Sequence, residues 1–260
     1  MKKEILIVPD VHGRDFWRDV LEYKDVPIIF LGDYVAPYVD YENISNEQSI
    51  EMLKEILQFR KDNPDRVTML LGNHDCSYYI GTKVCNNRVD NKNYDEIRKI
   101  FWNKDNVFKL THSITVNDKQ FVFSHAGYTY KWILNSEELF MSNNIDMILG
   151  DWDYLNRMND RRSDLLWRNM KATSFLRGGY DDAGSPIWAD FQEHINDNEL
   201  LTNKIQIFGH SWCKVPIHSK SEYEWYMLDC KEVFYIDDKG VVRFLKDDKE
   251  VEITKLKLTN

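Results

Sequence analysis

Apolar and polar positions alternate along the chain in a pattern typical of a sheet with helices packed on it. Five runs of strand-forming residues each end in a polar tip that contains Asp, Asn or His. These runs cover residues 4–8, 27–31, 66–71, 119–123 and 204–208. Between the second and third runs, apolar residues recur at helical spacing from about Ser45 to Lys61, where Ser45 and Gln48 form a capping box. The pattern predicts an α/β sheet covered on both faces, with ligands at the carboxyl ends of its strands.

The remaining segments follow other patterns. Residues 127–203 contain helical stretches around 132–141 and 154–170 and then the loop RGGYDDAGSP, without strands that end in polar tips. We expect this insertion to cover the site and to shape substrate access. After His210 the period becomes two, in EYEWYML, VFYI and VEITKLKL, which predicts hairpins that complete a second sheet. The expected organisation is a single domain over residues 1–260.

Composition and charge argue against several classes of protein. The chain has 260 residues with 43% hydrophobic content, enough for a large core, and its apolar runs are too short to cross a bilayer. The first residues, MKKEILIV, are interpreted as a strand and not as a signal peptide. A formal net charge of −9 argues against nucleic acid as a partner, because such binding needs Lys and Arg to neutralise phosphates. Four cysteines without a CxxC pair suggest neither a zinc ribbon nor a disulfide framework, so we expect a cytoplasmic protein.

The polar tips carry the residue types that bind divalent metals. Asp10 and His12 are two positions apart on extended chain, so their side chains lean to one face and can chelate a single cation. The other four tips supply Asp33, Asn73, His125 and His210. Oxygen and imidazole ligands without thiolate suit Mn, Fe, Zn or similar metals, and six such groups are too many for one tetrahedral site. One tip alone is more often a hydrogen-bonded turn, but five together predict two metals, with a carboxylate such as Asp33 bridging them.

Five motifs in the chain resemble those of a known family. PDVHG, GDYV, LLGNHD, SHAG and GHSW match, in order and spacing, the motifs of the calcineurin-like metallophosphoesterases, especially the phosphoprotein phosphatase and diadenosine tetraphosphate hydrolase branches. The match runs from Ile5 to about Trp212, and the motifs are highly specific as a set. The resemblance implies a four-layer αββα sandwich, in which two mixed β-sheets are flanked by helices and followed by C-terminal β-hairpins.

The resemblance also implies a role for each polar tip. The first metal would be bound by Asp10, His12 and Asp33, and the second by Asp33, Asn73, His125 and His210. Two divalent ions are implied, with Mn favoured over Fe, Zn or Ni. His74 matches the family's histidine that does not bind metal, and it would act as general acid to the leaving oxygen while a metal-bridging hydroxide attacks phosphorus. Trp212 stands where many members have a further histidine, which leaves the first metal an open place for water.

One departure from the family pattern concerns substrate binding. The phosphatase branch has an Asp-Arg pair after GDYV, where the acid orients the catalytic histidine and the arginine grips phosphate, but this chain has Ala36-Pro37. Arginine matches phosphate oxygens bidentately, so the candidate replacements are Arg14, Arg168 and Arg177. Arg177 is favoured because it opens the loop at 177–186, and Asn73 is expected to contact substrate as well. Asp75 either assists His74 or caps the turn.

The leading hypothesis is a phosphoesterase that hydrolyses phosphate monoesters of a protein or a small molecule. The alternatives within enzymes are a nucleotidase, a dinucleotide polyphosphate hydrolase or a phosphodiesterase. Aromatic residues in YVAPYVDY, 34–41, and SPIWADF, 185–191, would stack a base in those cases, although packing in the core is the commoner role for such residues. A binding module that holds a phosphorylated ligand without turnover also stays open, because of Ala36-Pro37, but the intact ligand set weighs against it.

Overall fold

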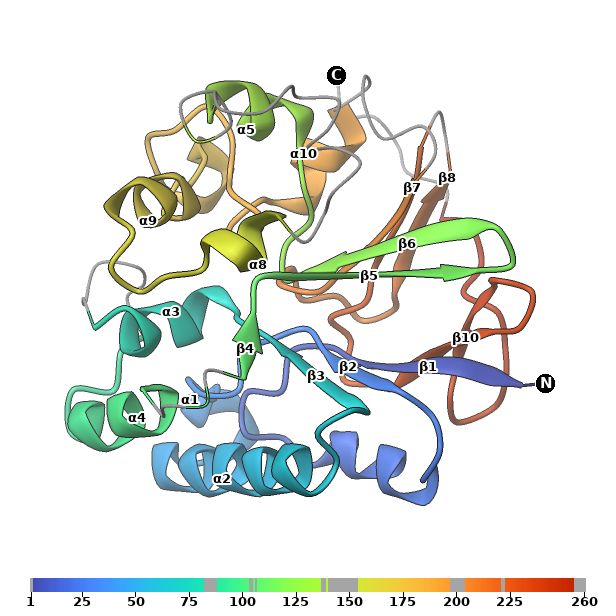
Figure 1. Ribbon diagram of the computed structural model, residues 1–260, viewed down its shortest axis with the longest axis horizontal. Coiled ribbons are helices and arrows are strands. Elements are labelled where there is room, and N and C mark those ends of the chain that lie inside the picture. Colours follow the sequence, from blue (N-terminus) through green and yellow to red (C-terminus); the bar gives the residue numbers. More distant parts are fainter. Residues whose placement is uncertain are drawn as a thin grey trace.

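Two mixed β-sheets stack face to face in the computed structural model (Figure 1), which describes residues 2–81, 88–102, 105, 107–136, 139, 154–196, 204–220 and 223–254. The first sheet has the strand order β11-β10-β1-β2-β3-β4. Its strands are β1 (Lys3–Val8), β2 (Ile28–Phe30), β3 (Val67–Leu70), β4 (Phe108–Lys109), β10 (Phe234–Asp237) and β11 (Val242–Phe244). Strands β1 to β4 run parallel, so their carboxyl ends meet at one edge.

The second sheet has the order β5-β6-β7-β9-β8. Its strands are β5 (Thr111–Val116), β6 (Lys119–Ser124), β7 (Lys204–Phe208), β8 (Ile217–Lys220) and β9 (Glu224–Met227). Strands β6, β7 and β9 are parallel, whereas β5 and β8 pair antiparallel at the two edges. The five strands predicted from apolar runs are therefore all present, as β1, β2, β3, β6 and β7.

The core between the sheets follows from the period-two pattern of the strands. Ile5 and Ile7 of β1 point into it, where they meet residues such as Phe121 and Ile207 of the second sheet. Leu6 and Val8 point to the opposite face and join the larger cluster that packs under the helices. Both faces of the first sheet are thus apolar, which explains why the strands read as continuous apolar runs.

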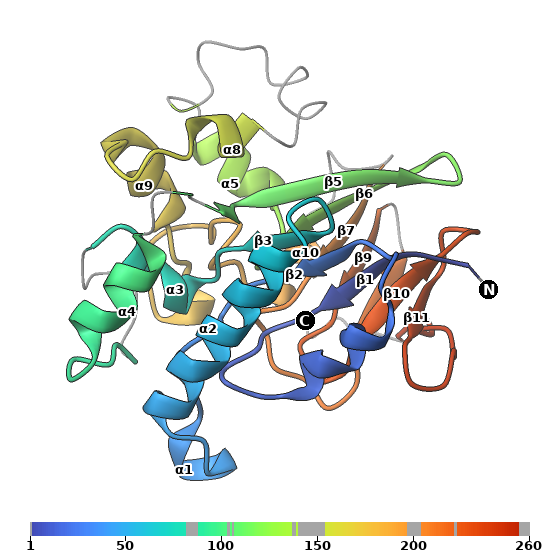
Figure 2. The same ribbon diagram turned by 60° about the horizontal axis from the view of Figure 1, so that its bottom comes forward.

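The helix predicted from Ser45 to Lys61 is α2 (Asn46–Asp62), with the capping box of Ser45 and Gln48 in place. Its stripe of Ile50, Leu53 and Ile56 is buried on the outer face of the first sheet (Figure 1). The 3-10 helix η1 (Phe16–Glu22) packs beside it. The same side of the molecule also carries α1 (Val39–Glu42), α3 (Asn73–Tyr79) and α4 (Tyr94–Phe101) (Figure 2).

The segment 127–203 supplies the helices on the other side of the molecule. It contains α5 (Tyr130–Asn135), α8 (Tyr154–Met158), α9 (Asp164–Met170), η2 (Phe175–Arg177) and α10 (Phe191–Asn196). α10 packs on the second sheet. The ring centroid of His194, on α10, lies 4.5 Å from that of Phe208, on β7. The helical stretches predicted around 132–141 and 154–170 correspond to α5, α8 and α9, while 140–153 lie outside the described residues.

The hairpin prediction needs a correction. β8 and β9 form a hairpin in the second sheet, but β10 pairs with β1 and β11 with β10, so this hairpin lies in the first sheet. β1 offers an open edge, and Phe234 and Ile236 of β10 extend the apolar layer between the sheets. Val251–Thr254 form no strand, and residues 255–258 of the predicted VEITKLKL strand lie outside the described residues. Strand β5, with the mixed sequence THSITV, had no apolar signal to predict it.

Candidate metal centre

The polar tips converge at the carboxyl edge of the two sheets, on tight loops. His12, Asp33 and His210 have φ values of 47°, 52° and 67°, a left-handed conformation that is uncommon for residues other than glycine. Two glycines leave room for a carboxylate to lie directly against the backbone. A Cβ on Gly209 would lie 1.9 Å from Asp10 Oδ2, and one on Gly72 would lie 2.0 Å from Asp33 Oδ1. The loops are therefore shaped to bring carboxylates against the neighbouring backbone, and such strain is typical of functional sites.

A first group of donors consists of Asp10, His12 and Asp33, with one ligand atom of each within 4.8 Å of the others. His12 Nε2 lies 3.6 Å from Asp33 Oδ2. The other ring nitrogen, Nδ1, lies 3.0 Å from the carbonyl oxygen of Val35 and donates to it. This bond leaves the lone pair of Nε2 directed at the carboxylate, as a metal ligand requires.

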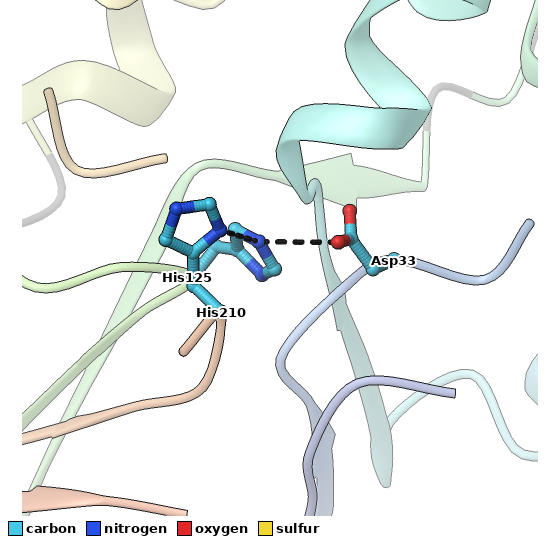
Figure 3. A group of neighbouring side chains, drawn as sticks. All are labelled: Asp33, His125 and His210. Carbon is cyan, nitrogen blue, oxygen red and sulfur yellow. Dashed lines mark hydrogen bonds and ion pairs between the residues drawn. The ribbon is translucent and has the colours of Figure 1, made fainter. Parts of the chain in front are cut away.

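A second group consists of Asp33, His125 and His210, again within 4.8 Å (Figure 3). His125 Nε2 lies 3.5 Å from Asp33 Oδ2 and 3.1 Å from His210 Nδ1. Asn73 Oδ1 lies 3.0 Å from both of these ring nitrogens. His125 donates from Nδ1 to the carbonyl oxygen of Leu31 at 2.9 Å, so its Nε2 also presents a lone pair. Asp33 thus belongs to both groups.

Burial sets the charge states of these groups. Removal from water lowers the pKa of His125 and holds the pKa values of His12 and His210 well below the usual value, so all three rings are neutral near pH 7. Burial raises the pKa of Asp10 to about 6 and that of Asp33 to about 7, since the carboxylates lose hydration. Neutral imidazoles and poorly solvated carboxylates that face shared points form a donor set that fits two divalent cations.

His74 lies beside the first group, at the start of α3. Its backbone N–H donates to Asp33 Oδ1 at 2.9 Å, and its ring centroid is 5.5 Å from that of His12. His74 Nε2 lies 2.7 Å from Arg88 Nη2. The histidine is therefore next to the metal centre, and its ring contacts a guanidinium that the sequence analysis had not considered.

Asp75 has a structural role in these loops. Its carboxylate accepts hydrogen bonds from the backbone N–H groups of Asp33, Tyr34 and Gly72, at 2.7, 3.0 and 2.9 Å. These bonds tie the loop after β2 to the start of α3. Of the two roles considered for Asp75, the turn-capping role is the one that these contacts support.

The three arginine candidates have different surroundings. Arg14 is buried: its Nε and Nη2 pair with Glu42 at 2.6 and 3.0 Å, and its Nη1 donates to the carbonyl oxygen of Asp10 at 3.2 Å. Arg168 is exposed on α9. Arg177 lies near the second group of donors, where its charge, after burial itself, helps to hold the pKa of His210 low, and it contacts Asp190 at 2.8 Å and the hydroxyl of Ser211. Arg177 is therefore the candidate whose charge acts on His210. It contacts one carboxylate oxygen and one hydroxyl, whereas Arg14 forms two bonds to the carboxylate of Glu42.

Sequence reasoning missed two residues near the centre. Arg88 stacks on Tyr38, with the guanidinium carbon 4.1 Å from the ring centroid, and the Tyr38 ring lies 5.0 Å from that of His12. Arg88 does not follow any of the five apolar runs of the sequence, so the strand-and-tip pattern did not mark it. Asp229 is buried, and burial is the main cause of its raised pKa. The charge of Asp10 raises the pKa of Asp229 further, so the two carboxylates are close. Asp229 follows β9 as the other tips follow their strands, and that pattern could have revealed it.

Comparisons with known proteins identify the class. The family model for calcineurin-like phosphoesterases matches residues 3–213, and the chain belongs to this family. Members are metal-dependent hydrolases of phosphoester bonds that typically bind two divalent metals, so this chain is such a hydrolase with a buried Asp and His centre. No curated protein sequence matches the chain. Among the described residues, no helix has the length and apolar content needed to span a bilayer.

Two solved structures are similar to the chain. A protein serine/threonine phosphatase from Saccharomyces cerevisiae is 15% identical, with a TM-score of 0.47 over 97% of this chain and 81% of that one. A cold-active protein-tyrosine phosphatase of a psychrophile, Shewanella sp., is also 15% identical, with a TM-score of 0.53 over 97% of this chain and 81% of that one. The likeness to the Shewanella structure confirms the expected fold, two mixed sheets flanked by helices.

Proposed function

We propose that the protein hydrolyses phosphate monoesters at two divalent cations. The observation that carries the proposal is the pair of donor groups that share Asp33. Asp10, His12 and Asp33 would hold one cation, and Asp33, Asn73, His125 and His210 the other. Bound cations of this kind supply a nucleophilic water and neutralise charge on the phosphoryl group. Oxygen and imidazole ligands suit Mn²⁺, Fe, Zn and Ni, and Mn²⁺ is the favoured ion by resemblance to the family.

In this proposal His74 is the general acid that donates a proton to the departing oxygen. Its position beside His12 supports this role, since the proton donor must lie at the edge of the centre and not within it. Arg88 contacts His74 Nε2 without substrate. A substrate phosphate would draw the Arg88 guanidinium toward its own oxygens, and this movement would free Nε2 to carry the proton.

Two arginines would grip the phosphate from opposite sides. Arg177 stands near His210, held by Asp190, and Arg88 stands near His12, held by the Tyr38 ring. Guanidinium groups bind phosphate oxygens in a bidentate manner. This pair would therefore replace the phosphate-binding arginine of the phosphatase branch, because Pro37 at that position has no side-chain donor. Asn73 would contribute its amide to the same substrate oxygens. The insertion at 127–203, which carries Arg177, would act as the cover of the site.

A second candidate function is hydrolysis of nucleotides or dinucleotide polyphosphates. Trp188 favours it, because this half-buried ring lies 5.8 Å from the ring of His210, edge to face, at the border of the second group. An aromatic ring in that place can stack a nucleobase. Tyr38 is a weaker candidate for stacking, since Arg14 and Arg88 already lie over its ring.

The test is an assay of the purified chain with Mn²⁺ on four substrates. These are p-nitrophenyl phosphate, its bis ester, a phosphotyrosine peptide and a dinucleotide polyphosphate. The peptide is included because the similar Shewanella structure is that of a protein-tyrosine phosphatase. We expect metal-dependent cleavage of the monoesters, with kcat about 10²- to 10⁴-fold lower in His74→Ala, since general acid catalysis contributes that much.

Other outcomes would redirect the proposal. Faster cleavage of the dinucleotide than of any monoester would favour the second candidate function. Metal binding without turnover of any substrate would indicate a phosphate-binding module. Equal kcat in wild type and His74→Ala would remove His74 from the mechanism. Arg168→Ala, a change on the exposed face of α9, is the control and should match wild type.

A further inference from the structure

The fold brings together two cysteines that are far apart in the sequence. The backbone N–H of Cys213 donates to the carbonyl oxygen of Asp229 at 2.9 Å, and Cys213 Sγ lies 3.4 Å from the same oxygen. Cys230 follows Asp229 directly, so this backbone bond sets the two cysteines side by side, and the Cys230 thiol lies near enough to Cys213 to raise its pKa. Both cysteines are half-buried, so small molecules can reach them. The spacing of the cysteines gave no sign of this pair.

The backbone arrangement suits a disulfide. The backbone bond between Cys213 and Asp229 holds the next residue, Cys230, beside Cys213. Disulfides bridge Cα atoms about 4.4–6.8 Å apart, so residues of adjacent chain segments can form one. The effect of the Cys230 thiol on the pKa of Cys213 indicates that the two side chains lie near one another. Bond formation therefore needs a local adjustment and no rearrangement of the sheets.

Both cysteines are close in sequence to groups of the metal centre. Cys213 lies three residues after His210, whose backbone N–H donates to both carboxylate oxygens of Asp10 at 3.0 Å. Cys230 follows Asp229, the buried carboxylate near Asp10. The two segments that a disulfide would join are thus the two that reach Asp10 from the second sheet.

We propose that Cys213 and Cys230 form a reversible disulfide that weakens cation binding at the metal centre, where His210 meets Asp10. The oxidant is a low-molecular-weight disulfide such as oxidised glutathione. One cysteine attacks it as a thiolate, forms a mixed disulfide and releases one glutathione thiol. The second cysteine then attacks the mixed disulfide, loses its proton and releases the second glutathione. The protein loses two hydrogens in total, and one molecule of oxidised glutathione becomes two of reduced glutathione.

The order of attack follows from the surroundings of the thiols. The hydrogen bond to Cys230, together with burial, raises the pKa of Cys213. Cys213 is therefore held as a thiol, and Cys230 makes the first attack. Closing a non-bonded sulfur pair to a bond of about 2.0 Å draws the two attached segments together. A shift of His210 disturbs its backbone bonds to Asp10, and loss of such supporting contacts typically lowers metal affinity about 10- to 100-fold.

The first experiment detects the disulfide without any assay of activity. The purified chain is incubated with oxidised glutathione, its free thiols are counted, and its peptides are mapped by mass spectrometry without reduction. We expect loss of two thiols and a peptide link between Cys213 and Cys230, reversed by dithiothreitol. Cys213→Ser and Cys230→Ser should form no internal link, while Cys85→Ser should behave as wild type. Four remaining thiols, or a link through Cys76 or Cys85, would overturn the proposal.

The second experiment measures Mn²⁺ binding by calorimetry after bound metal has been removed with a chelator. The oxidised protein should bind Mn²⁺ about tenfold less tightly than the reduced protein. Oxidant should leave the affinity of Cys213→Ser unchanged. Equal affinities in the oxidised and reduced wild type would refute the coupling to the metal centre, whatever substrate the enzyme hydrolyses.

Discussion

Replacement of Arg88 by alanine removes a guanidinium from the border of the metal centre. In the structure this group lies 2.7 Å from His74 Nε2 and is stacked 4.1 Å above Tyr38. If it grips the substrate phosphate, the variant loses a hydrogen bond to a charged group, which contributes about 1.5–3 kcal/mol. That energy corresponds to a loss of about 10- to 150-fold in kcat/KM. Arg88→Lys keeps the charge without the planar fork and should lose less.

The assay is steady-state hydrolysis of p-nitrophenyl phosphate with Mn²⁺, together with inhibition by inorganic phosphate. Arg88→Ala should raise both KM and the inhibition constant for phosphate, because substrate and product share the dianion. Tyr38→Leu removes the supporting ring, a cation–π contact of about 0.5–2 kcal/mol, so its loss should be about 2- to 30-fold. Arg168→Ala is the matched control. If Arg88→Ala stays within twofold of this control, Arg88 is not a phosphate ligand.

Three other predictions concern the loops and their charges. Gly72→Ala should abolish Mn²⁺ binding in calorimetry, because the new Cβ would lie 2.0 Å from Asp33 Oδ1; wild-type affinity would show that the loop has room. Asp75→Ala should lower the free energy of unfolding in urea by about 3 kcal/mol or more, since three backbone N–H groups lose their acceptor; a loss below about 1 kcal/mol would contradict this. Burial raises the pKa of Asp10 to about 6 and that of Asp33 to about 7, so protons compete with cations for these carboxylates in acid. The affinity for Mn²⁺ should therefore rise from about pH 5.5 to 7.5 and then level off. A flat affinity over that range would show that neither carboxylate titrates there.

The sequence predicted the strands and their tips for a physical reason. A buried parallel strand is a continuous apolar run, so an Asp or His directly after it stands out, as Asp33 does after β2 and His125 after β6. The carboxyl ends of parallel strands share one edge, and the tips were therefore expected to meet. The helix α2 was equally visible, because its capping box and its apolar stripe are both local signals.

Features that depend on contacts between distant residues were not visible. The β10–β11 hairpin was placed in the wrong sheet, because period-two patterning marks a strand but not the edge to which it adds. Arg88 lies in a polar stretch of the sequence, and its guanidinium reaches the centre beside the Tyr38 ring, some fifty residues earlier. Cys213 and Cys230 meet only through the pairing of the loop after β7 with the end of β9. The single domain, the cytoplasmic location and the choice of Mn²⁺ remain predictions.

The most direct test of the account is the number of cations that the chain binds, measured by calorimetry with Mn²⁺ and by anomalous scattering from crystals. Asp33 Oδ2 lies within 3.6 Å of both His12 Nε2 and His125 Nε2, so this carboxylate should touch both ions. We expect two Mn²⁺ per chain in wild type, at least one lost in His12→Ala with the His125 side still occupied, and neither retained in Asp33→Ala. A single Mn²⁺ in wild type, or two in Asp33→Ala, would contradict a centre built on a shared carboxylate.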